Sequence, residues 1–416
     1  MKTLRADVAV IGGGAAGLLA AALISERGFD TLLIEPNKLT GKKLRITGKG
    51  RCNLTNNCDN KQFMENVPCN ASFLYSSINR FGTAETMAFF ERIGVPLKTE
   101  RGNRVFPMSD SAHDVANALE RFGREKGVRI LHKRVTALKA SDGALTGVVA
   151  EDTEIICKAA VLCTGGASYP GTGSTGDGYT LAKSLGHTIV PPQPSLVPLV
   201  SEDDYCAEMQ GFSLKNVTLR VFDENSKPVF EELGEMLFTH YGVSGPLVLS
   251  ASSHMRDYET HKYRLAIDLK PGLSEQQLDE RILRDFKKYA NRDFANSLCD
   301  LAGHTMIPVL VRLSGIQEET KVNSVTKEQR KTLVKLFKEF PVSVAGPRPV
   351  DEAIITSGGV SVKEINPKTL ESKLINGLYF AGEIIDVDAY TGGFNLQIAW
   401  STAFAAAQSL EIRQTT

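Results

Sequence analysis

A glycine-rich turn close to the N-terminus constrains this chain more than any other feature. The string VAVIGGGAAG places Gly12, Gly14 and Gly17 in the spacing G-x-G-x-x-G, between an apolar run at 7–11 and a helical pattern at 15–27. The first glycine permits a tight turn, the second leaves the backbone open to close approach, and the third lets the helix pack on the strand. The sequence therefore predicts a strand, a turn and a helix of an open α/β sheet.

The residues that follow extend this pattern into a βαβ unit. Gly28 ends the predicted helix, and a second strand over 31–35 ends in Glu35. Amides at a helix start favour phosphate, and a carboxylate at this strand end can accept hydrogen bonds from ribose hydroxyls. An acidic residue here disfavours a 2′-phosphate, so FAD or NAD fits better than NADP. Ala15 and Ala16, with the three glycines, are the expected phosphate contacts.

Composition narrows the class of protein. At 416 residues, with 42% hydrophobic and 23% charged residues, the chain should fold into more than one globular unit. Lys plus Arg equals Asp plus Glu at 48 each, so a polyanion partner would need a local patch. Seven irregularly spaced cysteines predict reduced thiols and a cytoplasmic location, and no apolar run is long enough to span a membrane. No metal-site spacing is present, so no metal is expected.

Two proline-rich strings, VPPQPSLVP and AGPRPVDEA, divide the pattern into parts. Between them, alternating apolar residues predict antiparallel strands, and two capping boxes predict helices. After the second string, GLYFAGE reads as a strand and the final apolar stretch as a buried helix, so the chain returns to its first domain. The predicted parts are a nucleotide-binding domain at 1–190, an inserted β-rich domain at 191–272, a helical lobe at 273–344 and the second part of the first domain at 345–416.

The C-terminal strings favour FAD over NAD. The stretch from GLYFAGE to the last helix resembles the second fingerprint of FAD proteins in the glutathione reductase and fumarate reductase superfamily, with Gly382 and Glu383 at the strand end. A carboxylate suits a polyhydroxylated ribityl chain. The turn TGGFN, with Gly393, can present the amides of Asn395 and Leu396 to the pyrophosphate or to the flavin pyrimidine edge.

Two further strings fit the same superfamily. AVLCTGG, with Thr164 and Gly165, resembles its connecting motif. In that resemblance the backbone of Val135, in LHKRVTAL, would meet the adenine.

Nearly the whole chain resembles one bacterial family of FAD-dependent oxidoreductases, named after a hypothetical Haemophilus flavoprotein. The shared strings include GKKLRITGKGRCNLTN, GASYPGTGSTGDGY and TSGGVSV. The resemblance implies an α/β fold: a Rossmann-like FAD-binding domain with an inserted β-barrel-like domain and a small helical lobe. Activities linked to the family are reduction of a uracil in ribosomal RNA, reduction of ring double bonds in bile-acid intermediates, and oxidation of small amino ketones.

Three functions follow as hypotheses. The first is reduction of a conjugated C=C bond, in an enone or in rRNA, by a flavin that NADH or NADPH reduces. The second is oxidation of small amines with release of hydrogen peroxide. The third is FAD-dependent RNA binding without catalysis. No second G-x-G-x-x-G follows a strand, so a nicotinamide would visit transiently or be absent.

A basic loop follows the Glu35 strand. GKKLRITGKGRCN contains five cations and no acid, and we expect Lys43 and Arg51 to contact a phosphate of FAD, of NAD(P)H or of an RNA backbone, or to lie near the flavin pyrimidine. The alternative is a solvated basic loop.

Four residues are candidates for catalysis. His240 and Tyr241, in LFTHYGVSGP, could donate a proton or orient substrate, or be structural. Tyr390, before TGGFN, could stand beside the isoalloxazine or be a buried loop tyrosine. Cys52 could be a lone proton donor or a buried thiol. Five residues separate it from Cys58, whereas flavin disulfide reductases have four between their redox thiols, so a dithiol mechanism is not expected.

Overall fold

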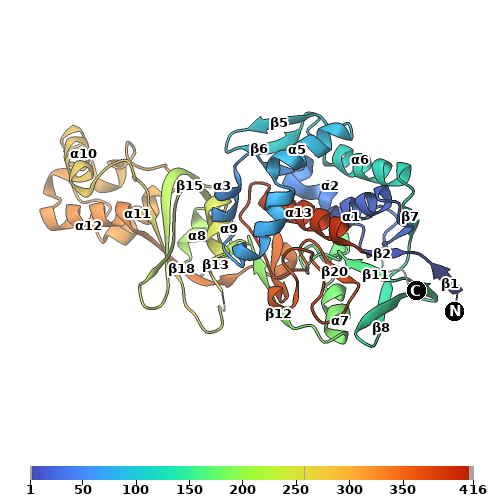
Figure 1. Ribbon diagram of the computed structural model, residues 1–416. Coiled ribbons are helices and arrows are strands. Elements are labelled where there is room, and N and C mark those ends of the chain that lie inside the picture. Colours follow the sequence, from blue (N-terminus) through green and yellow to red (C-terminus); the bar gives the residue numbers. More distant parts are fainter. Residues whose placement is uncertain (1, 257, 412–416) are drawn as a thin grey trace. The chain divides into compact units, whose positions relative to one another are not determined.

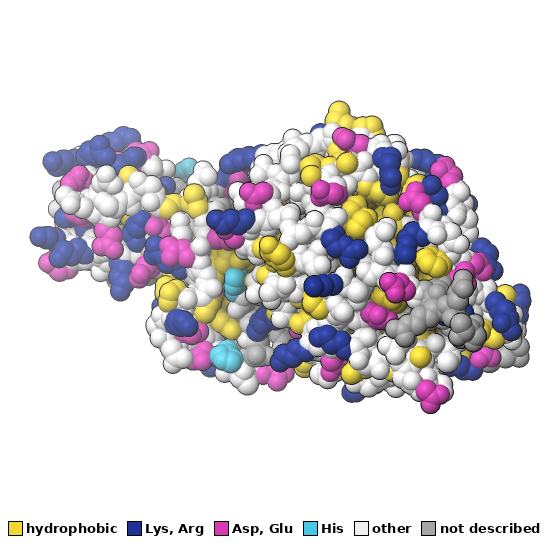
Figure 2. Space-filling model, in the orientation of Figure 1, with side chains coloured by type: hydrophobic (Ala, Val, Ile, Leu, Met, Phe, Trp, Pro, Cys, Tyr) yellow, Lys and Arg dark blue, Asp and Glu magenta, His cyan; other side chains and the backbone are white. Residues whose placement is uncertain are grey.

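The computed structural model (Figure 1) describes residues 2–256 and 258–411. The chain forms two compact units, one from residues 1–195 together with 350–416 and the other from 196–349. Lys and Arg side chains are interspersed with Asp and Glu over the face seen in Figure 2, in keeping with 48 residues of each sign. Within the described ranges, no helix has the length and apolar character that crossing a membrane requires.

A five-stranded parallel sheet is the centre of the first unit. Its strands are short and mostly buried on both faces, which explains why they read as unbroken apolar runs. In spatial order they are β20 (Leu378–Phe380), β11 (Ala159–Leu162), β2 (Val8–Ile11), β3 (Thr31–Ile34) and β7 (Arg129–Leu131).

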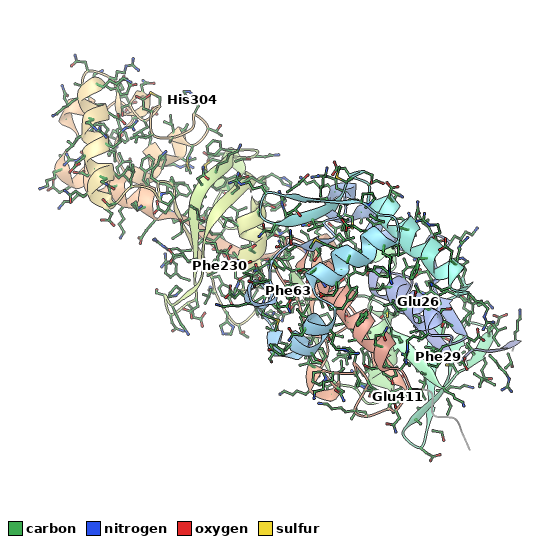
Figure 3. The ribbon with its side chains drawn as sticks, turned by 45° about the horizontal axis from the view of Figure 1, so that its top comes forward. Glu26, Phe29, Phe63, Phe230, His304 and Glu411 are labelled. Atoms are coloured by element: carbon green, nitrogen blue, oxygen red, sulfur yellow. The ribbon has the colours of Figure 1, made fainter. Side chains whose placement is uncertain are left out.

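The first and last long helices of the chain pack against each other beside this sheet. These are α1 (Ala15–Glu26) and α13 (Phe394–Ser409), both apolar on nearly every side. Arg27, at the end of α1, donates to the carbonyls of Ala407 and Leu410, where a cation suits the negative end of α13. Phe63 (Figure 3) packs its ring 5.6 Å from that of Phe394, the first residue of α13. The C-terminal helix α13 is therefore part of the core of the first unit, as the predicted return of the chain to its first domain requires.

Smaller sheets and helices complete the first unit. The sequence pattern over 129–138 predicts one strand, but this stretch is divided into β7 and β8, which join different sheets; between them the Lys133 amide donates to the Leu131 carbonyl. The remaining strands are β1 (Lys2–Arg5), β4 (Thr55–Asn56), β5 (Leu97–Glu100), β6 (Arg104–Pro107), β8 (Val135–Ser141), β9 (Ala144–Ala150), β10 (Thr153–Ile156), β12 (Ile189–Ser195) and β19 (Ile355–Val360). The remaining helices are α2 (Lys42–Ile46), α3 (Asn60–Glu65), α4 (Tyr75–Arg80), α5 (Thr83–Arg92), α6 (Ala112–Glu125) and α7 (Asp177–Ser184).

The first proline-rich string lies in a strand. Residues 191–194 belong to β12, which pairs with β19 in a two-stranded sheet, where proline is tolerated because every strand is an edge. The first unit accordingly continues to Ser195.

The second unit contains a closed six-stranded barrel, which confirms the barrel-like insertion. Alternating residues of its strands are buried, as the pattern at Leu219 and Val221 predicted. In barrel order the strands are β13 (Leu199–Ser201), β16 (Gly242–Ser244), β15 (Pro228–Thr239), β14 (Ser213–Phe222), β17 (Arg264–Asp268) and β18 (Phe340–Pro347).

Helices occupy most of the stretch predicted as a lobe. Both capping boxes are confirmed: the Ser274 side chain accepts from the Gln277 amide, and that of Thr326 from the Gln329 amide. Residues 340–344, at the end of the predicted lobe, are part of the barrel strand β18. The helices of this stretch are α10 (Glu275–Lys288), α11 (Ile307–Ser314) and α12 (Lys327–Lys338), whereas α8 (Tyr205–Glu208) and α9 (Pro246–Ser252) lie earlier in the second unit.

Candidate functional site

The glycine turn between β2 and α1 leaves no room for side chains at two positions. Gly12 has φ +98°, and its amide donates to the Ile34 carbonyl at 2.9 Å. A side chain there would collide with the Cys163 carbonyl, and one at Gly17 would collide with the Gly12 carbonyl. The first and third glycines thus fix the turn and the close packing of α1.

Gly14 differs from the other two glycines because it faces open space. A Cβ added there would meet no atom within 4 Å, and no side chain caps the first turn of α1, which contains Ala15 and Ala16. An exposed backbone and unpaired helix amides suit the approach of a diphosphate. The residues present at this turn fit the pyrophosphate of a dinucleotide.

Glu35 is held rigidly at the end of β3. The residue is 8% exposed, and its carboxylate accepts from the Gly13 amide at 2.7 Å, and from the Asn37 amide and side chain at 2.8 and 2.7 Å. Hydrogen bonds from both sides fix an acceptor beside the glycine turn. This position suits the predicted contact with ribose hydroxyls.

The two predicted fingerprints meet in space. Gly382, at the end of β20, has φ +80°, and a Cβ added to it would lie 2.9 Å from that of Ala16 in α1. Its amide donates to the Thr402 hydroxyl of α13 at 2.9 Å. The glycine of the C-terminal fingerprint is therefore packed against the first turn of the N-terminal helix.

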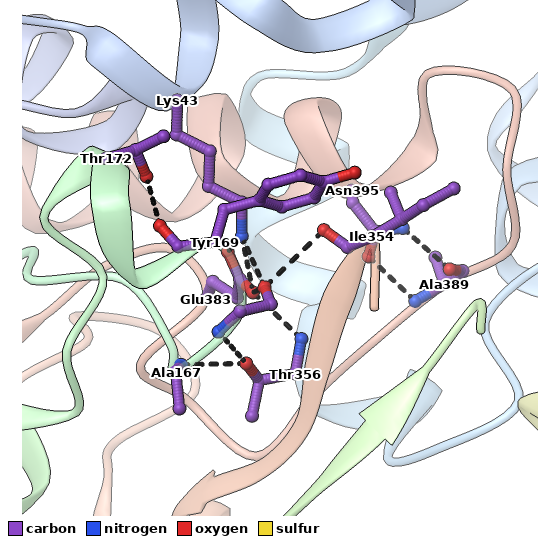
Figure 4. Close-up of polar contacts among 10 residues, drawn as sticks. Lys43, Ala167, Tyr169, Thr172, Ile354, Thr356, Glu383, Ala389 and Asn395 are labelled. Carbon is purple, nitrogen blue, oxygen red and sulfur yellow. Dashed lines mark hydrogen bonds and ion pairs between the residues drawn. The ribbon is translucent and has the colours of Figure 1, made fainter. Parts of the chain in front are cut away.

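Lys43 and Glu383 form an ion pair across 340 residues of sequence (Figure 4). Their closest atoms, Nζ and Oε2, are 2.7 Å apart, and the side chains are 21% and 22% exposed. The fully buried Ser168 lies within 2.7 Å of Nζ and 3.1 Å of Oε1, and the Thr356 amide donates to Oε1 at 2.9 Å. The predicted ribityl carboxylate is thus fixed by several partners and by one cation.

The TGGFN turn leads into α13 without a side-chain cap. Gly393 has φ +99°. The Asn395 side chain accepts from the Ala389 amide at 2.9 Å and donates to the Ala389 and Tyr390 carbonyls, so it fixes the preceding loop. The amides of Asn395 and Leu396 lie in the uncapped first turn, where an anionic or carbonyl group of a ligand can accept from them.

The connecting motif follows β11. Gly165 has φ +73°, and the buried Thr164 Oγ1 has no hydrogen-bond partner among the described residues. A buried hydroxyl without a partner is uncommon and fits a site completed by a ligand. Val135 begins β8 and is buried, and its adenine contact stays a prediction.

The basic loop does not behave as one patch. The Arg51 guanidinium donates to Glu100 at 2.5 Å and to Asp110 at 2.5 Å, and the hydrogen bond that it donates to Glu100 raises the pKa of Arg51 above its usual value. Arg45 is buried and donates to Asn117 at 2.8 Å, and burial lowers the pKa of Arg45. The string has no acid of its own, but the fold supplies acids from β5 and from the turn after β6.

The four candidate catalytic residues lie in different surroundings. Cys52 is fully buried, and burial raises the pKa of its thiol to about 12, so a buried thiol describes it better than an accessible donor. Tyr390 is half-buried in the loop that Asn395 fixes. His240 and Tyr241 form the tight turn between β15 and β16 in the second unit, their rings 4.8 Å apart. All seven cysteines, Cys58 included, are free.

Sequence reasoning missed two residues of the site. Ser168 touches both members of the ion pair, and the Thr356 hydroxyl accepts from the amides of Ala167 and Ser168 at 2.8 and 3.0 Å. Both lie in strings shared with the family, GASYPG and TSGGVSV, but a lone hydroxyl residue carries no spacing that reveals a partner.

A glycine-rich βαβ turn that meets a second glycine fingerprint from the far end of the chain defines a Rossmann-like FAD-binding oxidoreductase fold. The profile of the HI0933-like protein Rossmann domain matches residues 6–409. The chain belongs to this family of FAD-dependent oxidoreductases, as its shared strings predicted.

Relatives match along almost the whole chain. The 3-dehydro-bile acid delta(4,6)-reductase of Clostridium scindens is 32% identical over 97% of this chain and 98% of its own length. The ribosomal RNA dihydrouridine synthases of Haemophilus influenzae and Escherichia coli are each 29% identical, over 96% and 98% of this chain and 97% and 98% of theirs.

Solved structures share the fold at low identity. The FrdA chain of Escherichia coli quinol fumarate reductase aligns with a TM-score of 0.51 and 17% identity, covering 98% of this chain and 70% of that one. A 3-ketosteroid delta1-dehydrogenase from Sterolibacterium denitrificans aligns with a TM-score of 0.50 and 14% identity, covering 97% and 99%. These structures confirm the fold.

Proposed function

We propose that this protein is an FAD-dependent reductase of a C=C bond conjugated to a carbonyl, either the enone of a steroid or bile-acid intermediate or a uracil in rRNA. NADH or NADPH is the proposed transient electron donor, and the cytoplasm the proposed location. Reduced FAD supplies the hydride for such a bond.

The full-length similarity to three reductases carries this proposal. One relative is named for reducing ring double bonds of a 3-dehydro-bile acid, and two for making dihydrouridine in ribosomal RNA. Both substrates present a C=C bond conjugated to a carbonyl: hydride adds to the electron-poor carbon farther from the carbonyl, and a proton adds to the carbon next to it, so one chemistry serves both.

The chain's own groups have distinct proposed roles in holding FAD. Gly14 and the first turn of α1 receive the pyrophosphate, Glu35 the adenosine ribose, and Glu383 the ribityl hydroxyls. Lys43 places a positive charge next to Glu383, at 2.7 Å, where it can also stabilise negative charge on a reduced flavin. The buried Thr164 hydroxyl, which lacks a partner among the described residues, gains one from the bound cofactor.

Reduction of the bond also needs a proton at the carbon next to the carbonyl. Of the four candidates, we propose Tyr390 as the first to test, because it is half-buried in the same unit as the fingerprints and lies in the loop before α13. A phenol can deliver a proton to an enolate-like carbon. His240, Tyr241 and Cys52 are the alternatives.

Anaerobic reduction of the purified yellow protein tests the proposal. We expect NADH or NADPH to bleach the flavin, and an enone steroid, or RNA from a strain lacking this gene, to restore its colour as the double bond is reduced. Bleaching by an amino ketone, followed by rapid peroxide release in air, would contradict it in favour of an amine oxidase. FAD and RNA binding without any turnover would favour the non-catalytic alternative.

A further inference from the structure

Tyr169 combines an unfavourable backbone conformation with an exposed aromatic ring. Its φ and ψ are 54° and 58°, in the left-handed region, and it is the one aromatic among the described non-glycine residues with positive φ. Bulky residues avoid this region, and strain of this kind persists where the surroundings enforce it, often at functional sites.

The surrounding turn enforces this conformation. The Thr172 amide and hydroxyl both donate to the Tyr169 carbonyl, at 2.9 and 2.8 Å. Pro170 follows directly, and the Gly173 amide donates to its carbonyl at 3.0 Å. A short 3₁₀ turn therefore holds Tyr169 in place (Figure 4).

This turn is anchored at the proposed flavin site. The preceding residue, Ser168, is fully buried and bonds both Lys43 and Glu383, while its amide donates to Thr356. Tyr169 therefore directly follows the residue that bonds both members of the ion pair. In Figure 4 its side chain is drawn together with the Lys43 and Glu383 side chains.

The ring is not used for packing the protein. Among the described residues of its unit, Tyr169 stands outside the hydrophobic core, and it is 37% exposed. Ile354 is also 37% exposed, and its carbonyl lies 3.5 Å from the Ser168 hydroxyl. Two residues with exposed apolar side chains are therefore tied to the same buried serine, Tyr169 as its neighbour in the chain and Ile354 through its carbonyl, next to a half-buried ion pair.

We propose that Tyr169 is a specificity-determining residue whose ring, with Ile354 beside it, contacts the flat apolar ring system of an enone steroid. This inference rests on the proposed reductase function and selects between its two substrate classes. An aromatic face and an aliphatic side chain gain more from a fused hydrocarbon ring than from a uracil, whose edges need hydrogen-bond partners.

The Tyr169→Gly substitution separates a binding role from a structural one. Tyr169→Gly removes the ring and also relieves the left-handed strain, so the protein should be no less stable. Asp142→Gly is the matched control, because Asp142 has φ 53° in the exposed β8–β9 turn. Tyr169→Phe keeps the ring and removes the hydroxyl.

The measurement is binding of testosterone, an enone steroid, to the oxidised holoenzyme, followed through the flavin absorption spectrum. We expect the dissociation constant to rise about tenfold in Tyr169→Gly, as loss of an aromatic contact predicts, and to stay within about twofold in Tyr169→Phe and Asp142→Gly. FAD content and the unfolding midpoint should not fall.

Several results would overturn the inference. These are no binding of testosterone by the wild type, equal binding by Tyr169→Gly, a loss in Tyr169→Phe as large as in Tyr169→Gly, or a loss of bound FAD, which would make the ring a flavin contact. Testosterone that binds through Tyr169 but is never reduced would instead refute the enone part of the proposed function alone. Reduction with unchanged binding in Tyr169→Gly would refute this inference alone.

Discussion

Lys43 and Arg51 lie eight residues apart in one basic string, yet the fold gives them different partners. Lys43 pairs with Glu383 among buried hydroxyl groups, beside the meeting point of the two glycine fingerprints. Arg51 pairs with Glu100 and Asp110 in a cluster that is about one-third exposed or more. A run of like charges therefore predicts cations but not their roles, because their partners come from distant segments.

The largest expected effect distinguishes the Glu383 carboxylate, which pairs with Lys43, from the Glu100 carboxylate, which pairs with Arg51. Glu383→Ala removes the acceptor proposed for the ribityl hydroxyls and leaves Lys43 without its partner, so FAD affinity should fall roughly 100-fold, about 3 kcal/mol. Glu100→Ala, the matched control in the Arg51 cluster, should leave affinity unchanged. Titration of the apoproteins with FAD measures both. Equal losses would show that the two clusters do not differ in function.

The sequence predicts which residues of this site are neighbours where those residues lie close together in the chain. Gly12, Gly14 and Glu35 lie within one βαβ unit, so spacing alone indicates their neighbours. Lys43 and Glu383 could each be predicted singly, but not as a pair, because 340 residues separate them. The acids around Arg51 escaped prediction for the same reason, and the break between β7 and β8 depends on which sheet each strand joins.

The second effect concerns the support behind Glu383. Thr356→Val removes the acceptor for the amides of Ala167 and Ser168, leaving two donors without a partner, and should lower the free energy of unfolding by about 2 kcal/mol. Thr356→Ser should recover most of it. Denaturant unfolding measures the change. If Thr356→Ser lost as much unfolding free energy as Thr356→Val, the stabilising group would be the Thr356 methyl group and not its hydroxyl.

A smaller effect, on the midpoint potential of bound FAD, distinguishes Lys43 from Arg51. Lys43→Gln removes a charge proposed to stabilise reduced flavin, so the midpoint potential of bound FAD should fall by roughly 30 mV, about 1.4 kcal/mol for two electrons. Arg51→Gln should not shift it. Spectroscopic titration against a redox dye gives both values. A shift in Arg51→Gln but not in Lys43→Gln would reverse the assignment.

The smallest effect at neutral pH lies at Cys52, in the same string. Burial raises the pKa of its thiol from 9.0 to about 12, so the folded state keeps the proton where the unfolded state loses it. The stabilisation is complete below pH 9 and is lost as the pH rises towards 12. Cys52→Ala should therefore show a shallower decline in unfolding free energy over that range, by up to about 1.4 kcal/mol per pH unit. Parallel curves would contradict a buried thiol.

We propose that the two ends of the chain hold one FAD between them. FAD content of Gly14→Val combined with Glu383→Ala, against the wild type, tests it most directly. Valine at 14 projects into open space at φ −80°, so the fold should survive, as circular dichroism can check. We predict a yellow wild type and a folded, colourless double variant that takes up no added FAD. A double variant that keeps its FAD, or a wild type that never binds it, would contradict the account.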